Sequence, residues 1–243
     1  MIVPIALYNS EIWGSILLPN NVSTTDYLLD ETNIQNIVER LQNRFLKIIL
    51  GVNTKSTNWA VRSELGRKPL TIKVYERMIR YYQHIYNTKN KFLQEALIIN
   101  KELEQCGFKS WYNGFKRILK FMKLSEKTII ESKNINRIIK VTVTNLYNKI
   151  WDEERKRQQL KGKLQIYAEI KTKNCFEKYL GLENMNIRKA ITKIRISSHK
   201  FPIETGRFEE REKSDRICPL CCNGIGNEEH YIFECEDKII VNV

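Results

Sequence analysis

Apolar residues recur every three or four positions through most of the first 150 residues, which is the period of an amphipathic helix. The clearest run comprises Ile34, Ile37, Val38, Leu41, Phe45, Ile48 and Ile49. Thr32 and Gln35 form a capping-box pattern ahead of it, and Gly51 ends it. The opposite side is basic, with Arg40, Arg44 and Lys47. This stretch is predicted to be a helix with a basic outer face.

The same period predicts a series of further helices along the chain. They lie at about 57–65, 75–86, 92–103, 111–122 and 135–150, and, nearer the C-terminus, at 175–182 and 187–199. Ser110 is the predicted N-cap of the fourth, and His84 is predicted on a helix surface. No strong alternation of apolar and polar residues and no internal repeat occurs. The expected fold is mainly α, a helical array followed by a small C-terminal metal module.

Charge divides the predicted helices into two groups. Residues 152–173 are highly charged and mostly basic, and we interpret them as an exposed helix end and a linker. This interpretation gives a helical region at 1–151, a basic linker at 152–173, and a helix with a metal module at 174–243.

Near the C-terminus, Cys218, Cys221, His230 and Cys235 have the spacing C-x2-C-x8-H-x4-C. Three thiolates and one imidazole suit the tetrahedral coordination of Zn²⁺, and four protein ligands leave no open position for a reacting water. Asn223, Gly224 and Gly226 permit the chain reversal between the two halves of the motif. The motif predicts a structural zinc ion.

The cysteine spacing alone does not exclude two further states of these thiols. They could be reduced and buried without a metal, or joined in disulfides, although a secretory signal is not evident. Cys222 could replace Cys221 as a ligand, and Cys106 and Cys175 are expected to be buried small residues.

The formal net charge of +13 on a chain that is 42% hydrophobic indicates a folded protein with an affinity for polyanions. The alternative is that this charge only maintains solubility. No stretch reaches the roughly 18 apolar residues of a membrane span, so no membrane association is expected, and we expect an intracellular location in the nucleus, the cytoplasm or both.

Signatures of catalysis are absent from the sequence. It contains no G-x-S-x-G, no phosphate-binding G-x-x-x-x-G-K and no G-x-G-x-x-G. The five aspartates are far apart, so the adjacent pair that a two-metal polymerase needs is missing. These absences disfavour an independent enzyme.

Three segments together resemble a known family. They are P-I-A-L-Y-N-S-E-I-W-G at 4–14, the stretch L-Q-N-R-F-L-K-I-I-L-G through G-R-K-P-L at 41–70, and I-T-K-I-R-I-S-S-H-K-F-P-I-E-T-G-R-F at 191–208, which leads into the cysteine motif. In this order they resemble the region after the polymerase core in reverse transcriptases of non-LTR, LINE-like retrotransposons. The resemblance implies a thumb-like beginning, helices that hold RNA and target DNA, and a zinc knuckle.

The resemblance also implies which residues contact RNA or DNA. The family's basic stretch corresponds to Lys193, Arg195, His199, Lys200 and Arg207. We add Arg188 and Lys189 from the same predicted helix, and Tyr231 as an aromatic that could stack on bases, as could Phe201 and Phe208. The family's fingers, palm and endonuclease have no counterpart in this sequence, so polymerase activity is not expected of this chain alone; an upstream polymerase core would be a partner.

Two functional hypotheses follow. In the first, the chain is a nucleic-acid-binding part of a retrotransposon reverse transcriptase. In the second, it is a protein-interaction module in which zinc only stabilises the fold, and Tyr231 or Phe233 forms a miniature core around the ion. Salt dependence separates the two, because binding to phosphates weakens steeply as salt rises.

Overall fold

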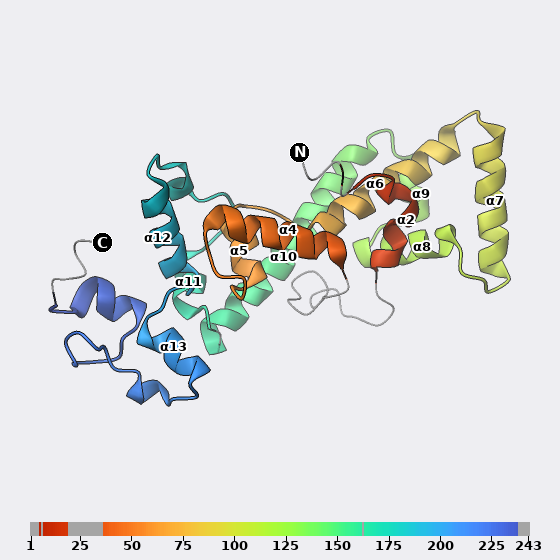
Figure 1. Ribbon diagram of the computed structural model, residues 1–243. Helices are drawn as coiled ribbons and strands as arrows, with labels where there is room; N and C mark the ends of the chain where they lie inside the picture. The colour runs from red at the N-terminus through yellow and green to blue at the C-terminus, as the bar shows by residue number, and fades with distance from the viewer. Residues whose placement is uncertain (1–4, 6, 19–35, 162, 238–243) are drawn as a thin grey trace.

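A computed structural model describes residues 5, 7–18, 36–161 and 163–237 (Figure 1). Helices dominate it, and the described residues contain no strand, only isolated β-bridges such as Leu65–Phe176. The α-helices are α2 (Ser10–Trp13), α4 (Ile37–Leu50), α5 (Asn58–Glu64), α6 (Leu70–Asn87), α7 (Lys91–Gln105), α8 (Trp111–Met122), α9 (Glu126–Glu131), α10 (Ile135–Lys161), α11 (Gln165–Ile170), α12 (Met185–Arg195) and α13 (Pro202–Phe208). Short helical turns are η1 (Gly14–Leu17), η2 (Lys178–Gly181), η3 (Lys213–Asp215) and η4 (His230–Glu234). The mainly helical fold class is therefore confirmed, and no described helix is both long and apolar enough to cross a bilayer.

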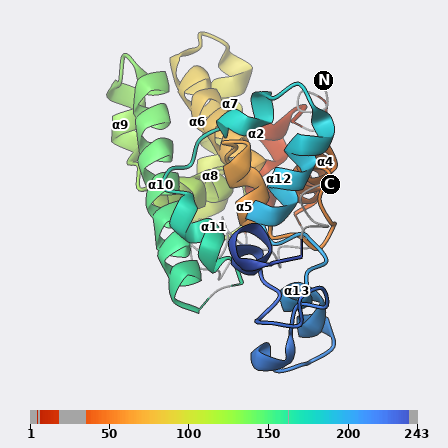
Figure 2. The ribbon, with the colours of Figure 1, turned by 90° about the vertical axis from the view of Figure 1, so that its left-hand side faces the viewer.

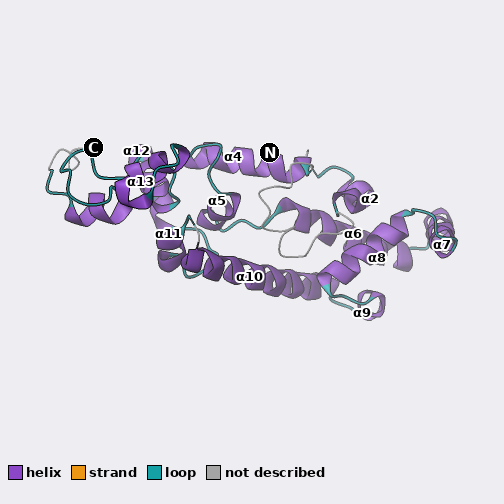
Figure 3. Ribbon diagram, turned by 90° about the horizontal axis from the view of Figure 1, so that it is seen from below, coloured by secondary structure: helices purple, strands orange, loops and turns teal. Residues whose placement is uncertain are grey.

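The molecule is elongated, with α7 at one end and the segment that follows α13 at the other (Figure 1). The long α10 runs beneath the shorter helices and spans much of this length (Figure 3). We call α2 to α11 the helical body and residues 201–237 the metal module.

Several helices begin at a residue whose side chain accepts a hydrogen bond from a backbone N–H group of the first turn. The predicted cap Ser110 accepts from Asn113 N (3.1 Å), as expected. The predicted capping box of Thr32 and Gln35 lies outside the described residues. The described start of α4 is capped instead by Asn36, whose Oδ1 accepts from the backbone N–H of Glu39 (3.2 Å). Gly51 ends α4 in the left-handed conformation (φ 66°), as its position predicted.

The core of the helical body centres on α6. Tyr75, Met78, Ile79 and Tyr82 are fully buried there, and the ring of Tyr82 stacks on Phe115 of α8 at 4.2 Å between centroids. These burials confirm the apolar periods predicted for α6 and α8, and His84 is exposed on α6 as predicted.

Two glycines let α2 and η1 approach α6 and α8 closely. A Cβ at Gly14 would collide with Val74, and one at Gly114 would collide with Ser15. The N-terminal segment therefore packs so closely against α6 and α8 that neither glycine leaves room for a side chain.

The face of α4 that packs inward is not the predicted one. Val38, Leu46 and Leu50 are buried, together with Asn43, which accepts from Arg62 Nη1 (3.1 Å). Most of the predicted apolar face is exposed; we call its residues the α4 stripe, namely Ile37, Leu41, Phe45, Ile48 and Ile49. α4 is apolar on two adjacent faces, and α5 and α6 cover only one of them.

The predicted linker is helical over most of its described residues. α10 continues through residues 152–161, and α11 packs Tyr167 edge-on against Trp59, 5.5 Å between centroids. The predicted helix end is thus present, and the stretch interpreted as a linker also contains the buried residues Leu164, Tyr167 and Ala168, which the charge density hid. The next predicted helix, 175–182, is helical only as the turn η2.

A buried polar network joins α12 to the body. Glu64, fully buried at the end of α5, accepts from Arg195 Nη2 (3.0 Å) and from the Tyr179 hydroxyl. Arg195 also pairs with Glu177 (3.4 Å). Because a buried carboxylate is costly without partners, this network fixes α12 on α5.

Candidate metal centre

Four side chains near the C-terminus converge on one point. One donor atom from each of Cys218, Cys221, His230 and Cys235 lies within 4.8 Å of every other. The closest pairs are Cys221 Sγ and His230 Nε2 at 3.2 Å, and Cys218 Sγ and Cys235 Sγ at 3.9 Å. The latter separation is far longer than a disulfide bond of about 2 Å, so these two sulfurs are not joined in a disulfide. The cluster could hold a metal ion, as the spacing predicted.

The first two ligands come from a tight backbone loop. The antiparallel bridge of Ile217 and Ile225 closes it, and Cys218 N donates to Gly224 O (3.0 Å). Cys222 N donates to Cys218 O (3.0 Å), and Cys222 has a positive φ of 56°. This turn leaves the Cys222 side chain exposed while Cys221 joins the cluster. The choice between the two neighbouring cysteines therefore falls on Cys221.

The second pair of ligands flanks the turn η4, which begins at His230 and is followed by Cys235. Asn227 Oδ1 accepts from His230 N (2.8 Å), which fixes the start of this turn. The ring presents Nε2 to Cys221 and Nδ1 to Glu234 Oε2 (3.4 Å). A carboxylate beside Nδ1 favours a proton there, which leaves the Nε2 lone pair available to a metal.

Hydrogen-bond donors around Cys218 favour the thiolate form of this cysteine. Burial raises its pKa, but backbone N–H groups of Cys221 and Leu220 and the Tyr231 hydroxyl donate to the sulfur, and together they lower the pKa to about 6. Burial and the neighbouring Cys218 raise the pKa of Tyr231, so its hydroxyl stays a donor. A thiolate at neutral pH is the form that binds metals.

Aromatic stacking attaches the module to the end of α12. The rings of His199, Phe201 and Tyr231 form a ladder, with centroids 4.1 and 4.2 Å apart. His199 Nε2 also lies 2.9 Å from Glu228 Oε1, which accepts from Ser197 Oγ as well (2.8 Å). Tyr231 thus belongs to the small core beside the metal ligands, whereas Phe233 is exposed.

The predicted nucleic-acid residues divide into internal and surface positions. Arg195, His199 and Tyr231 are engaged in the contacts described above, and Arg188 Nη1 donates to Leu180 O (3.2 Å). Lys193, Lys200 and Arg207 are exposed, Arg207 pairing with Glu204 (3.3 Å), while Lys189 is half-buried. Lys193, Lys200 and Arg207 are thus the members of the predicted set that lie fully on the surface.

One neighbouring cation was not anticipated. The ammonium of Lys55, from the loop between α4 and α5, lies 5.6 Å from the centroid of the Phe208 ring. Asn53 N (3.0 Å) and Ser56 Oγ (2.9 Å) both bond Ser198 Oγ, which holds this loop against the segment before the module. The two partners lie far apart in sequence, and no local pattern signals the pairing.

The cysteines predicted to be buried, Cys106 and Cys175, are exposed.

Comparison with known proteins identifies no relative. No protein-family model, curated protein or solved structure matches this chain. The chemistry of the site therefore has to be interpreted from its own residues.

Proposed function

We propose that the metal is Zn²⁺ and that its role is structural. A tetrahedral site with bonds of about 2.3 Å to sulfur and 2.0–2.1 Å to nitrogen has edges of about 3.8 Å between sulfurs and 3.5 Å between sulfur and nitrogen. The separations of 3.9 Å (Cys218–Cys235) and 3.2 Å (Cys221–His230) are close to these edges. When bound, the ion would be held by those four residues, which supply a full tetrahedral set. Elemental analysis of protein purified without chelator should find one equivalent of zinc per chain.

We further propose that the protein binds single-stranded RNA or DNA at the metal module. The observation that carries the proposal is the exposed Phe208 ring with Lys55 over it. Single strands are held by aromatic rings that stack on bases and by cations that contact the backbone phosphates. Phe208 remains 66% exposed, so a base can reach it.

Surrounding charge supports the same surface. Arg207 precedes Phe208, and Lys200 lies two residues after Ser198, which anchors the loop that carries Lys55. Lys55 and Arg207, cations from two distant parts of the chain, thus lie near one exposed aromatic. The net charge of +13 would add long-range attraction for a polyanion.

The resemblance to the post-polymerase region of non-LTR retrotransposon reverse transcriptases is consistent with this proposal. It rests on the three sequence segments and the cysteine motif, and we propose it as the origin of the chain. In that setting the surface around Phe208 would position RNA or primer for a polymerase core. A polymerase activity of this chain by itself is not proposed.

The test is the anisotropy of a labelled single-stranded oligonucleotide across a salt series. Phe208→Ala should weaken binding by about 5- to 150-fold, since a base stacked on an aromatic contributes about 1–3 kcal/mol. Lys55→Ala should reduce the slope of log K against log salt by about 0.7, the value for one phosphate of a single strand.

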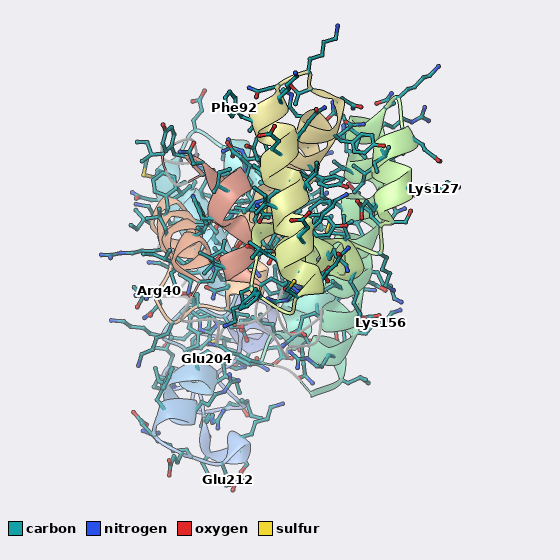
Figure 4. All side chains as sticks on the ribbon, turned by 90° about the vertical axis from the view of Figure 1, so that its right-hand side faces the viewer. Arg40, Phe92, Lys127, Lys156, Glu204 and Glu212 are labelled. Carbon is teal, nitrogen blue, oxygen red and sulfur yellow. The ribbon has the colours of Figure 1, made fainter. Side chains whose placement is uncertain are left out.

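The chain offers matched controls at its other end. Phe92 on α7 is 83% exposed, and the Lys127 side chain on α9 is 80% exposed; both lie away from the module (Figure 4). Phe92→Ala and Lys127→Ala should leave affinity unchanged. Equal losses from Phe92→Ala and Phe208→Ala, or binding that ignores salt, would contradict the proposed surface and favour a protein-interaction role.

A further inference from the structure

The α4 stripe continues into a groove between α4 and α12. The two helices lie side by side (Figures 1 and 2). The groove has a volume of about 430 Å³. Its apolar lining includes Ile48 and Ile49 from α4, Met185 from α12, and Phe176 and Leu180 from the segment between. Ile48, Phe176 and Met185 are each more than half exposed, so this floor is open to a partner.

The banks of this groove are basic. Arg44 is exposed on α4, one turn before Ile48 of the groove lining, and Arg40 is exposed one turn further from the groove. Lys189 lines the groove from α12, a helix without any acidic residue; Arg188 also lines it, but its guanidinium donates to Leu180 O (3.2 Å). Glu39, the acidic residue of α4, points inward and accepts from Thr71 N (2.7 Å). The floor is therefore apolar and both rims are positive.

We propose that this surface binds an amphipathic helix of another protein whose polar flanks carry Asp and Glu. The α4 stripe spans about 18 Å along its helix axis (12 residues at about 1.5 Å each), which matches three turns of a docked helix. An apolar face of such a helix fills grooves of this kind through anchors at i, i+3, i+4 and i+7. Acidic flanks would face Arg44 on one rim and Lys189 on the other.

The chemistry of the groove disfavours two other anionic partners. Nucleic-acid bases stack on aromatic planes, whereas the floor is mostly aliphatic, with Ile48, Ile49 and Met185. An anionic membrane prefers a convex helix face that lies flat in the headgroup region, whereas α4 and α12 form two banks of a concavity. A helix with projecting side chains fits both the shape and the charge.

A peptide-display selection on the full chain tests this proposal. The probe is a random library of peptides of about 16 residues, long enough for some four turns. Counter-selection uses Ile48→Glu, which places a charge on the groove floor at an exposed position. Selected peptides should show helical apolar spacing with acidic flanks, and Ile48→Glu should weaken them at least about tenfold, as truncation of a central anchor does.

The matched control is Ile98→Glu on α7, which changes an isoleucine of similar exposure far from the groove. It should leave peptide affinity unchanged, and Arg44→Glu should weaken binding most at low salt. No enrichment on the native chain over Ile48→Glu, or equal loss with Ile98→Glu, overturns the proposal.

Two further arms separate the other anions. If vesicles with about 30% phosphatidylserine, or a single-stranded RNA, lost binding with Ile48→Glu as strongly as the peptides did, the groove would belong to that partner and the proposal would fail. Because Phe208 lies outside this groove, loss of RNA binding in Phe208→Ala leaves the outcome here unaffected.

Discussion

The helical body and the metal module differ in how many apolar side chains they bury. In the body, α6 alone buries Val74, Tyr75, Met78, Ile79 and Tyr82 completely. Among residues 201–237, the buried apolar side chains are Ile203 and Cys218. So small a core contributes little to stability, so the bound zinc that we propose would supply much of the stability of this region. The same chain thus combines two sources of stability.

Removal of the metal should have the largest effect and should affect the module alone. A structural zinc ion contributes on the order of 10–16 kcal/mol to the folding of small metal-dependent domains. Cys218→Ser should therefore release residues 201–237 to rapid hydrogen exchange while α6, α8 and α10 stay protected. Cys222→Ser, at the exposed neighbouring thiol, should change neither region. Loss of protection in α6 on metal removal would contradict the comparison.

Loss of a core aromatic should instead destabilise the helical body and leave the metal module unchanged. Phe115 is fully buried and stacks on Tyr82 and Trp111. Phe115→Ala should lower the free energy of unfolding of the body by about 3–5 kcal/mol, measured by denaturant titration. Phe92→Ala, at an exposed position, should change it by less than about 0.5 kcal/mol. Zinc stoichiometry should be the same in both variants.

Disruption of the buried polar network at Glu64 should weaken the attachment of α12 to the helical body. Glu64→Gln removes the charge that Arg195 pairs with, and removal of one partner of a buried ion pair costs about 3 kcal/mol or more. Hydrogen exchange should rise in α12 and in residues 171–181, with the zinc cluster still formed. Unchanged exchange in α12 would show that aromatic and apolar contacts hold it without the ion pair.

A pH effect of smaller size is expected at the N-terminus of α9. Glu126 accepts from Tyr112 (2.6 Å) and Tyr82; burial raises its pKa, but these hydroxyls and Lys101 outweigh it and hold the pKa below its ordinary value. Its contribution to stability is therefore present above about pH 4.3, the ordinary glutamate value, and is lost as pH falls through the lower folded-state value.

Denaturant midpoints as a function of pH measure this contribution. Glu126→Gln should cost about 1–2 kcal/mol at pH 6, as the loss of a charged hydrogen-bond acceptor does. It should also flatten the fall of stability between about pH 5 and 3. Glu131→Gln, in the same helix with an exposed pair to Lys127, should have almost no effect. An unchanged slope in Glu126→Gln would mean that its hydrogen bonds do not distinguish the charged form.

The smallest effect should come from the α4 stripe. Ile48→Ser should change stability by less than about 0.5 kcal/mol, because the side chain is already exposed. Ile79→Ala on α6 should cost about 2–5 kcal/mol, because this isoleucine is fully buried. Thermal unfolding of the two variants measures the difference between two residues of one type on neighbouring helices.

The sequence predicted those features that depend on local spacing. The periods of α6 and α8, the cap at Ser110 and the four ligand candidates all involve residues within about one helix or one turn. Each was confirmed as a helix, a cap or a cluster of donor atoms.

Features that depend on distant residues could not be predicted in this way. The period of α4 does not say which of two apolar faces α5 and α6 will cover, and composition placed residues 152–173 in a linker although Tyr167 meets Trp59. Arg195 was predicted to contact RNA or DNA, and its ion pair with Glu64 could not be foreseen because Glu64 is 131 residues away. The pairing of Lys55 with Phe208 has the same origin.

The buried polar network at Glu64 also has a consequence for folding during synthesis on the ribosome. Its partner Arg195 is translated 131 residues later. At about 5–20 residues per second, this interval is roughly 7–26 s. During that time Glu64 lacks the arginine that pairs with it in the folded chain, and because a buried carboxylate without its ion pair is costly, we expect the end of α5 to be fully enclosed only after residue 195 has emerged. The burial of the end of α5 would then have to wait until Arg195 has been translated.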